Sequence, residues 1–145
     1  MSALLKQRAR IVRVRRLQHD LAASAAAEAA GKVQLLETSR QRLADMRSEL
    51  NAIPGPTSGS GLARIGELAM RLDVARQGLA PSLDSARAAA AQKERIRLSK
   101  RRDQESAEKL QKSAAVAADA LAERQTLRTP RLRQRARLSN DGGDQ

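Results

Sequence analysis

The sequence contains no Phe, Trp, Tyr or Cys in its 145 residues. Because aromatic side chains normally fill much of a globular core, their absence argues against a rounded domain. Without cysteine there is neither a disulfide framework nor a thiolate metal ligand, which fits a reducing compartment. His19 is the only histidine, we expect its ring to be exposed, and the acidic residues are scattered. We therefore expect no catalytic residues, no cofactor, no metal site and no enzymatic activity.

Long apolar runs are missing as well. No window approaches the roughly 18 consecutive apolar residues of a membrane-spanning helix. The basic N-terminus lacks the leucine-rich segment of a secretory signal, so we do not expect one, although an Arg-rich start is also compatible with a mitochondrial transit peptide.

What the sequence does contain is helix-forming residues. Alanine is the commonest residue, with 28 copies, and Leu, Arg, Glu, Gln and Lys make up most of the rest. This composition is typical of coiled coils and long helices. The one strong interruption is residues 53–61, IPGPTSGSG, where two prolines and three glycines stop a helix and permit chain reversal.

We therefore predict an all-α fold, a long antiparallel two-helix coiled-coil hairpin with a possible kink near Gly78 and Pro81. The expected parts are a first helix over residues 1–52, a turn over 53–61, a second helix over 62–128, and a basic, then polar, tail over 129–145. Thr129 and Pro130 are expected to end the second helix, because the residue before a proline avoids helical geometry.

Apolar residues recur at spacings of three and four in both tracts, which predicts one buried stripe on each helix. The first stripe is expected to comprise Ile11, Val14, Leu17, Leu21, Leu36, Leu43, Met46, Leu50 and Ile53, and to pass through Ala25, Ala29 and Lys32 between Leu21 and Leu36. The second is expected to comprise Leu62, Ile65, Leu68, Leu72, Ala75, Leu79, Leu83, Ala86, Ala90, Ile96, Ala107, Leu110, Ala114, Ala117 and Leu121.

Folding about the turn predicts that facing residue numbers add up to about 115. Leu36 would then face Leu79, and the second helix would overhang the first from about Gln111. The same register places Gly31 level with Gly78 and Pro81, where a proline removes a helical donor. Two interpretations remain open for these three residues: a functional hinge, or a defect that a coiled coil tolerates.

The formal charge of +12 is concentrated in three clusters. Residues 1–20 and 93–102 each hold six basic residues against one acidic residue, and residues 124–138 hold six arginines and no acidic residue. The hairpin would gather the clusters at the end that carries both termini. Either these residues form a solvated helix face, or their mutual repulsion is relieved by an acidic or phosphate-bearing partner.

One local motif resembles a known family. Residues 11–23 read IVRVRRLQHDLAA and continue as an Ala/Glu/Gln-rich coil to Leu50. This arrangement resembles the FliJ family of flagellar type III export proteins and their injectisome counterparts, the YscO-like stalk proteins. The resemblance implies a coiled coil whose terminal tip enters the hexameric ring of the export ATPase, in the manner of a rotary ATPase γ subunit.

The resemblance also implies partners and a location. The outer part of the coil would contact the export gate membrane protein, and some members handle export chaperones. Such a protein is cytoplasmic and peripheral to the inner-membrane export apparatus, held there through its partners. Gate contacts in the family use aromatic side chains, so no gate-binding residue is assigned here. The residues expected to face acidic loops of the ATPase ring are Arg8, Arg10, Arg13, Arg15, Arg16, Arg128, Arg131 and Arg133.

Two other functions remain open. Clustered arginines also suit a helical hairpin that binds nucleic acid without sequence preference, since neither a base-stacking aromatic nor a reader motif is present. A basic amphipathic N-terminal helix also suits a scaffold or a coil that lies on anionic lipid.

Overall fold

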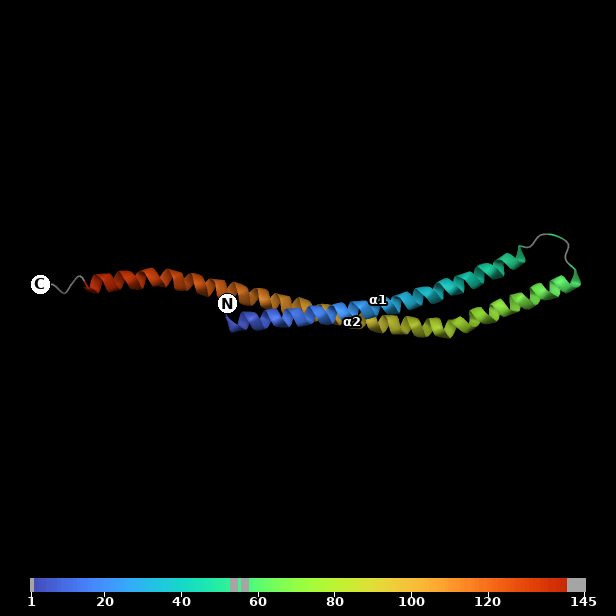
Figure 1. Ribbon diagram of the computed structural model, residues 1–145, viewed down its shortest axis with the longest axis horizontal. Coiled ribbons are helices and arrows are strands. Elements are labelled where there is room, and N and C mark those ends of the chain that lie inside the picture. The colour runs from blue at the N-terminus through green and yellow to red at the C-terminus, as the bar shows by residue number, and fades with distance from the viewer. Residues whose placement is uncertain (1, 53–54, 56–57, 141–145) are drawn as a thin grey trace. The chain divides into compact units, whose positions relative to one another are not determined.

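The computed structural model describes residues 2–52, 55 and 58–140, with side chains described as far as Arg128. Two helices make up nearly all of this part: α1 comprises Ala3–Asn51 and α2 comprises Gly59–Asn140 (Figure 1). No strand occurs among the described residues. The prediction of an all-α hairpin of two long antiparallel helices is therefore confirmed.

The connection between the helices uses the residue types that such a turn requires. Gly55 has φ 116°, a left-handed conformation that glycine adopts without steric cost. Ser58 caps α2, because its Oγ accepts a hydrogen bond from the Gly61 amide at 3.2 Å. The second helix thus begins at Gly59, three residues before the predicted start. Of the predicted turn, Ile53, Pro54, Pro56 and Thr57 lie outside the described residues.

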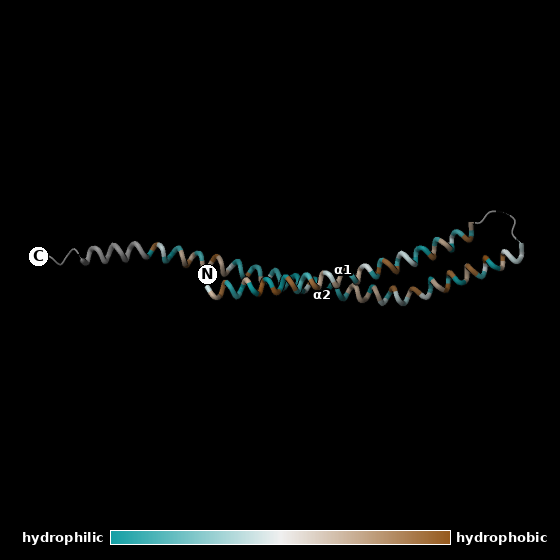
Figure 2. Tube along the Cα trace, viewed as in Figure 1, coloured by the Kyte–Doolittle hydropathy of each residue, from teal (hydrophilic) through white to brown (hydrophobic). Residues whose placement is uncertain are grey.

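The chain divides into two compact units, each of which pairs a segment of α1 with a segment of α2. The loop-side unit is His19–Lys100, and the terminal unit combines Met1–Gln18 with Arg101–Gln145. Figure 2 shows hydrophobic residues interspersed with hydrophilic ones along both helices, without one long apolar run. Each helix segment can therefore bury only a narrow stripe.

Cross-helix ion pairs fix the loop-side unit. Arg47 Nε lies 3.3 Å from Asp73 Oδ2, and Arg87 Nη2 lies 3.0 Å from Glu37 Oε1. Leu83 is the most deeply buried large side chain described, at 1% exposure. It lies four residues from Arg87, on the turn of α2 that faces the Glu37 region.

In the terminal unit, Arg15 Nη1 lies 3.4 Å from Asp103 Oδ2 and Arg16 Nη2 lies 3.0 Å from Glu108 Oε1. Val12 and Ala107 are the buried residues of its described part. Side chains this small bury little area, so the apolar contribution to the stability of this unit is modest.

The predicted register is wrong by about one helical turn. In the four cross-helix ion pairs, the partners' residue numbers add up to between 118 and 124 rather than about 115. Leu36 is therefore level with residues 82–88 of α2, a range that includes Leu83 but not Leu79. The cause lies in the connection, which lets the first turns of α2 extend past the end of α1 (Figure 1). Leu62, Leu68 and Met46, which were predicted to be buried, are all exposed.

The predicted stripe is partly correct in each unit, and in the terminal unit Ala107 and Ala114 are buried or half-buried as predicted. Leu36, Leu43 and Leu50 of α1 and Leu72, Leu79 and Leu83 of α2 are half-buried or buried, as predicted. In the terminal unit, the buried or half-buried positions of α1 include Leu5, Arg8, Val12 and Arg15, which follow a seven-residue repeat. The predicted Ile11, Val14 and Leu17 are exposed in this unit, and so is Leu21 in the loop-side unit. On α2, the exposed positions of the prediction are Leu62, Leu68, Ala75, Ile96, Leu110, Ala117 and Leu121.

The second helix does not end at residue 128 as predicted. It continues through Thr129 and Pro130 to Asn140. A proline removes one donor, but the adjoining turns keep their own hydrogen bonds, so a long helix can continue past it. Of the predicted tail, residues 141–145 lie outside the described part.

Candidate interaction surfaces

Two of the predicted ring-facing arginines bind the other helix. Arg15 Nη1 donates hydrogen bonds to Gln18 Oε1 at 3.1 Å and to Asp103 Oδ2 at 3.4 Å. Arg16 lies on the other side of the helix pair, where its Nε donates to Glu108 Oε1 at 3.0 Å. We therefore assign Arg15 and Arg16 to the contact between α1 and α2.

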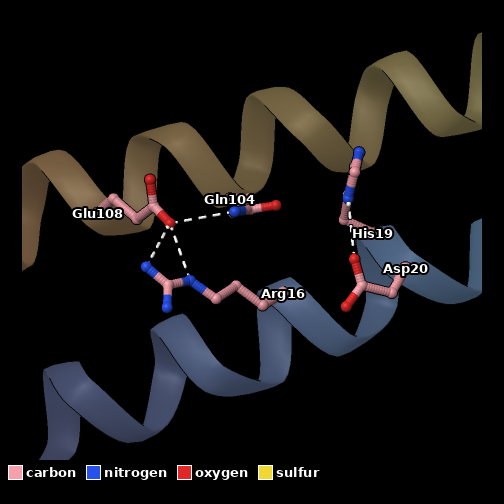
Figure 3. Close-up of polar contacts among 5 residues, drawn as sticks. All are labelled: Arg16, His19, Asp20, Gln104 and Glu108. Carbon is pink, nitrogen blue, oxygen red and sulfur yellow. Dashed lines mark hydrogen bonds and ion pairs between the residues drawn. The ribbon is translucent and has the colours of Figure 1, made fainter. Parts of the chain in front are cut away.

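Glu108 is the best-connected carboxylate in the terminal unit. Its Oε1 accepts hydrogen bonds from Gln104 Nε2 and Arg16 Nε, both at 3.0 Å (Figure 3). The hydrogen bond from Gln104, followed by that from Arg16, lowers the pKa of Glu108 below its ordinary value of 4.5. The glutamate is therefore ionised over the whole neutral range.

The other predicted arginines of α1 differ in their exposure. Arg8 is half-buried at a position of the seven-residue repeat, whereas Arg10 and Arg13 are exposed. Among the described residues, none of these three forms an ion pair. Arg10 and Arg13 are therefore the predicted arginines of α1 that remain available to a partner.

Beyond the N-terminus of α1, α2 continues as an unpaired helix (Figure 1). Ala118 is its last half-buried residue, and residues 119–128 are all exposed. This single-helix extension, residues 119–140, was predicted to begin at about Gln111 and begins later because the true register is shifted.

The extension carries the remaining predicted arginines. Of these, Arg128 is exposed and forms no ion pair within the described part of the chain, and the same holds for Arg124, which was not predicted to face the ring. Arg131 and Arg133 lie on the helical backbone, but their side chains are outside the described residues. In the observed register Ala3 is level with about residue 116. Arg128 is therefore about 18 Å further along at 1.5 Å per residue. The exposed arginines are therefore spread along the terminal unit, with Arg10 and Arg13 on α1 and Arg124 and Arg128 on the extension.

The middle cluster, residues 93–102, is partly neutralised. In the loop-side unit, Arg97 Nη2 lies 2.6 Å from Glu94 Oε1, and this hydrogen bond lowers the pKa of Glu94. In the terminal unit, Arg101 Nε lies 3.0 Å from Glu105 Oε1. Because these arginines have carboxylate partners within their own helix, we do not include them in the candidate surface.

The described residues contain no group of three or more His, Asp or Glu side chains arranged to hold a metal ion. Their helices include none with the length and apolarity needed to cross a membrane. The chain matches no protein-family model, no curated protein and no solved structure. The candidate surfaces therefore rest on the geometry of this chain alone.

The expectation that His19 is exposed is wrong. Its side chain is only 21% exposed, with Nδ1 lying 3.3 Å from Asp20 Oδ1 (Figure 3). Its Nε2 is shielded from solvent and has no hydrogen-bond partner. His19 follows Val12 by seven residues and so continues the buried repeat of α1.

The predicted hinge residues do not lie at one level. Both helices are unbroken at Gly31, Gly78 and Pro81. The ion pair of Glu37 with Arg87 places Gly31 roughly level with residues 88–93, more than ten residues from Gly78. A Cβ atom added at either glycine would meet no atom within 4 Å, so close packing does not require glycine there. The yellow-green part of α2, around Gly78 and Pro81, changes direction without a break (Figure 1).

Sequence reasoning missed one surface of the terminal unit. Several residues that the prediction placed inside it are exposed, and four of them, together with Leu4, form what we call the apolar face: Leu4, Ile11, Val14, Leu110 and Ala117. Leu4 was not assigned to the predicted stripe. The sequence does contain a sign of this surface. Two apolar stripes run along α1, because Leu5 and Val12 repeat as regularly as Leu4 and Ile11.

Proposed function

We propose that this chain is a coiled-coil stalk of a type III export ATPase, which couples the hexameric ring to the export gate and handles export chaperones. The terminal unit would enter the ring, while the loop-side unit would extend toward the gate. Association with the inner membrane would occur through these partners.

The observation that carries the proposal is a group of four exposed arginines that form no ion pair among the described residues and lie near the N-terminus of α1 or on the extension: Arg10, Arg13, Arg124 and Arg128. They lie in the terminal unit, which combines a helix pair with a protruding single helix. Arginine suits contacts with carboxylates, because its planar guanidinium presents paired donors. Acidic loops around the inside of a ring would provide matching carboxylates on several sides of the helix.

A charge-reversal experiment tests this proposal. The full-length variant R10E/R13E/R124E/R128E should lose binding to the reconstituted hexameric export ATPase from the same organism, while its circular dichroism keeps the helical signal. The matched control is R42E/R64E/R76E/R95E, which reverses four arginines in the loop-side unit and should bind as the parent does. Equal binding by the parent and the terminal-unit variant contradicts the proposal.

Nucleic-acid binding is the competing function and is measured with the same variants. If the four arginines neutralise phosphates, affinity for duplex DNA should fall steeply and linearly on a log–log plot against salt concentration. The stalk proposal would be replaced by DNA binding if three results agree. The parent binds DNA at physiological ionic strength in a salt-dependent way, the terminal-unit variant does not, and the parent does not bind the ATPase.

A further inference from the structure

The apolar face is composed of residues from both helices. Arg15 hydrogen-bonds both Gln18 of α1 and Asp103 of α2, so these two residues flank the same side of the helix pair. Ile11 lies seven residues before Gln18, and Leu110 lies seven residues after Asp103. In an antiparallel pair both steps lead two turns in the same direction, so Ile11 and Leu110 also flank this side.

One further heptad gives Leu4 on α1 and Ala117 on α2 at the same side. Val14 follows Ile11 by three residues and widens the face on α1. The large members are substantially exposed: Leu4 by 54%, Ile11 by 39%, Val14 by 47% and Leu110 by 51%. The face thus has the two-sided layout onto which a third helix packs in a bundle.

The border of the face is basic. On α1, Arg10 lines the same hollow as Ile11 and Val14, and it is exposed and without an ion pair among the described residues. Residues 1–18 contain six basic residues and no acidic one. A second copy of this chain would bring the same cations together across the contact, whereas a carboxylate-bearing helix would pair with them.

We infer that the apolar face binds an acidic amphipathic helix of another protein, which completes a three-helix bundle with the terminal unit. The leucines and isoleucine bury the apolar stripe of that helix, and Arg10 pairs with a glutamate or aspartate beside the stripe. This inference goes beyond the ring proposal, because its specificity depends on apolar residues that the arginine contacts do not require.

A synthetic peptide of three heptads provides the probe, with leucine at the two core positions of each heptad and glutamate at the flanking positions. Binding of the labelled peptide to the full-length protein is measured by fluorescence anisotropy. The variant I11Q/L110Q should weaken binding at least about tenfold, since it removes two buried apolar contacts from the interface. The matched control L35Q/V74Q alters one exposed apolar residue on each helix of the loop-side unit and should leave binding unchanged.

A second peptide, with lysine in place of every glutamate, tests the chemistry of the partner. It should bind at least about tenfold more weakly at low salt, because its cations face Arg10 in a segment, residues 1–18, that holds six basic residues and no acidic one. Equal affinity for the two peptides, or equal binding by I11Q/L110Q and the parent, overturns the inference.

Two other occupants would give different results. If sedimentation equilibrium shows that the parent is a dimer and that I11Q/L110Q is a monomer, the face would be assigned to a second copy. If the parent cosediments with phosphatidylcholine–phosphatidylserine vesicles, the variant does not, and the parent binds no peptide, the apolar face would be assigned to a membrane. Either result overturns the inference. The variant keeps every arginine, so its ATPase binding separately reports on the ring proposal.

Discussion

Arg16 and Glu108 are 92 residues apart in sequence, yet the Arg16 Nε and Nη2 atoms both lie 3.0 Å from Glu108 Oε1. This pair lies on the side of the terminal unit opposite the one where Arg15 contacts Asp103. Two contacts on opposite sides restrict sliding of one helix along the other and rotation about its axis. Polar residues therefore help to specify the register in a unit whose buried side chains are small.

The first prediction concerns pH. The pKa of Glu108 is lowered in the folded state, so the stabilisation from its ionised form is present above the unfolded pKa of about 4.5 and is lost as pH falls through the lower folded value. The E108Q variant should be less stable than the parent at pH 7, and the difference should shrink below pH 4.5 and vanish at lower pH. Thermal unfolding followed by circular dichroism at several pH values measures this.

The matched control is E123Q, because Glu123 is exposed and forms no ion pair in the described part of the chain. This variant should show a much smaller and less pH-dependent difference from the parent. A stability loss for E108Q that persists unchanged at pH 3 would mean that the glutamate acts through packing rather than charge.

The second prediction concerns the core. Leu83 is 1% exposed, and its truncation removes a large part of the apolar volume buried near Glu37 and Leu36. The L83A variant should lose about 2 to 3 kcal/mol of unfolding free energy, despite the better helix propensity of alanine. The exposed Leu35, changed to alanine, should cost less than about 0.5 kcal/mol. Urea unfolding measures the free energy of both variants. Comparable losses in the two variants would show that Leu83 is not a core residue.

The fold was predictable from sequence because its determinants are local. Alanine-rich composition, apolar spacing and the residues around Gly55 predict two antiparallel helices, and the structure confirms them. The helix ends were less predictable. Ser58 provides a cap that starts α2 early, and the adjoining turns carry the helix past Pro130.

The register and the surfaces near the termini were not predictable in this way. In α1, Leu5 with Val12 and Leu4 with Ile11 offer two apolar stripes of similar strength, and periodicity alone does not choose between them. The choice depends on cross-helix partners such as Asp103 and Glu108, which become neighbours of α1 only once the register is set. The candidate arginines were correctly named as basic residues, but their division into paired and exposed residues required the structure.

The third prediction tests the register directly. The natural chain has no cysteine, so an introduced pair reports on one contact without background. The L36C/L83C variant should form a disulfide efficiently under mild oxidation, because its two positions are level across the loop-side unit. The L36C/L79C variant should react much more slowly, since a one-turn offset of about 6 Å takes the Cα atoms outside disulfide range. Non-reducing electrophoresis compares the rates, and a faster reaction of the second pair would restore the register that the sequence predicted.

The fourth prediction concerns the single-helix extension. Residues 119–128 are exposed on all sides, whereas residues 103–115 pack against α1 in the terminal unit. An isolated helix is held by its backbone hydrogen bonds alone, and its local opening costs little free energy. Hydrogen exchange measured by mass spectrometry should show amides of residues 119–128 exchanging at least about tenfold faster than those of 103–115. Equal protection would mean that the extension is covered in solution. If the protection of residues 119–128 rises only when the export ATPase is added, the arginines of the extension lie within that interface.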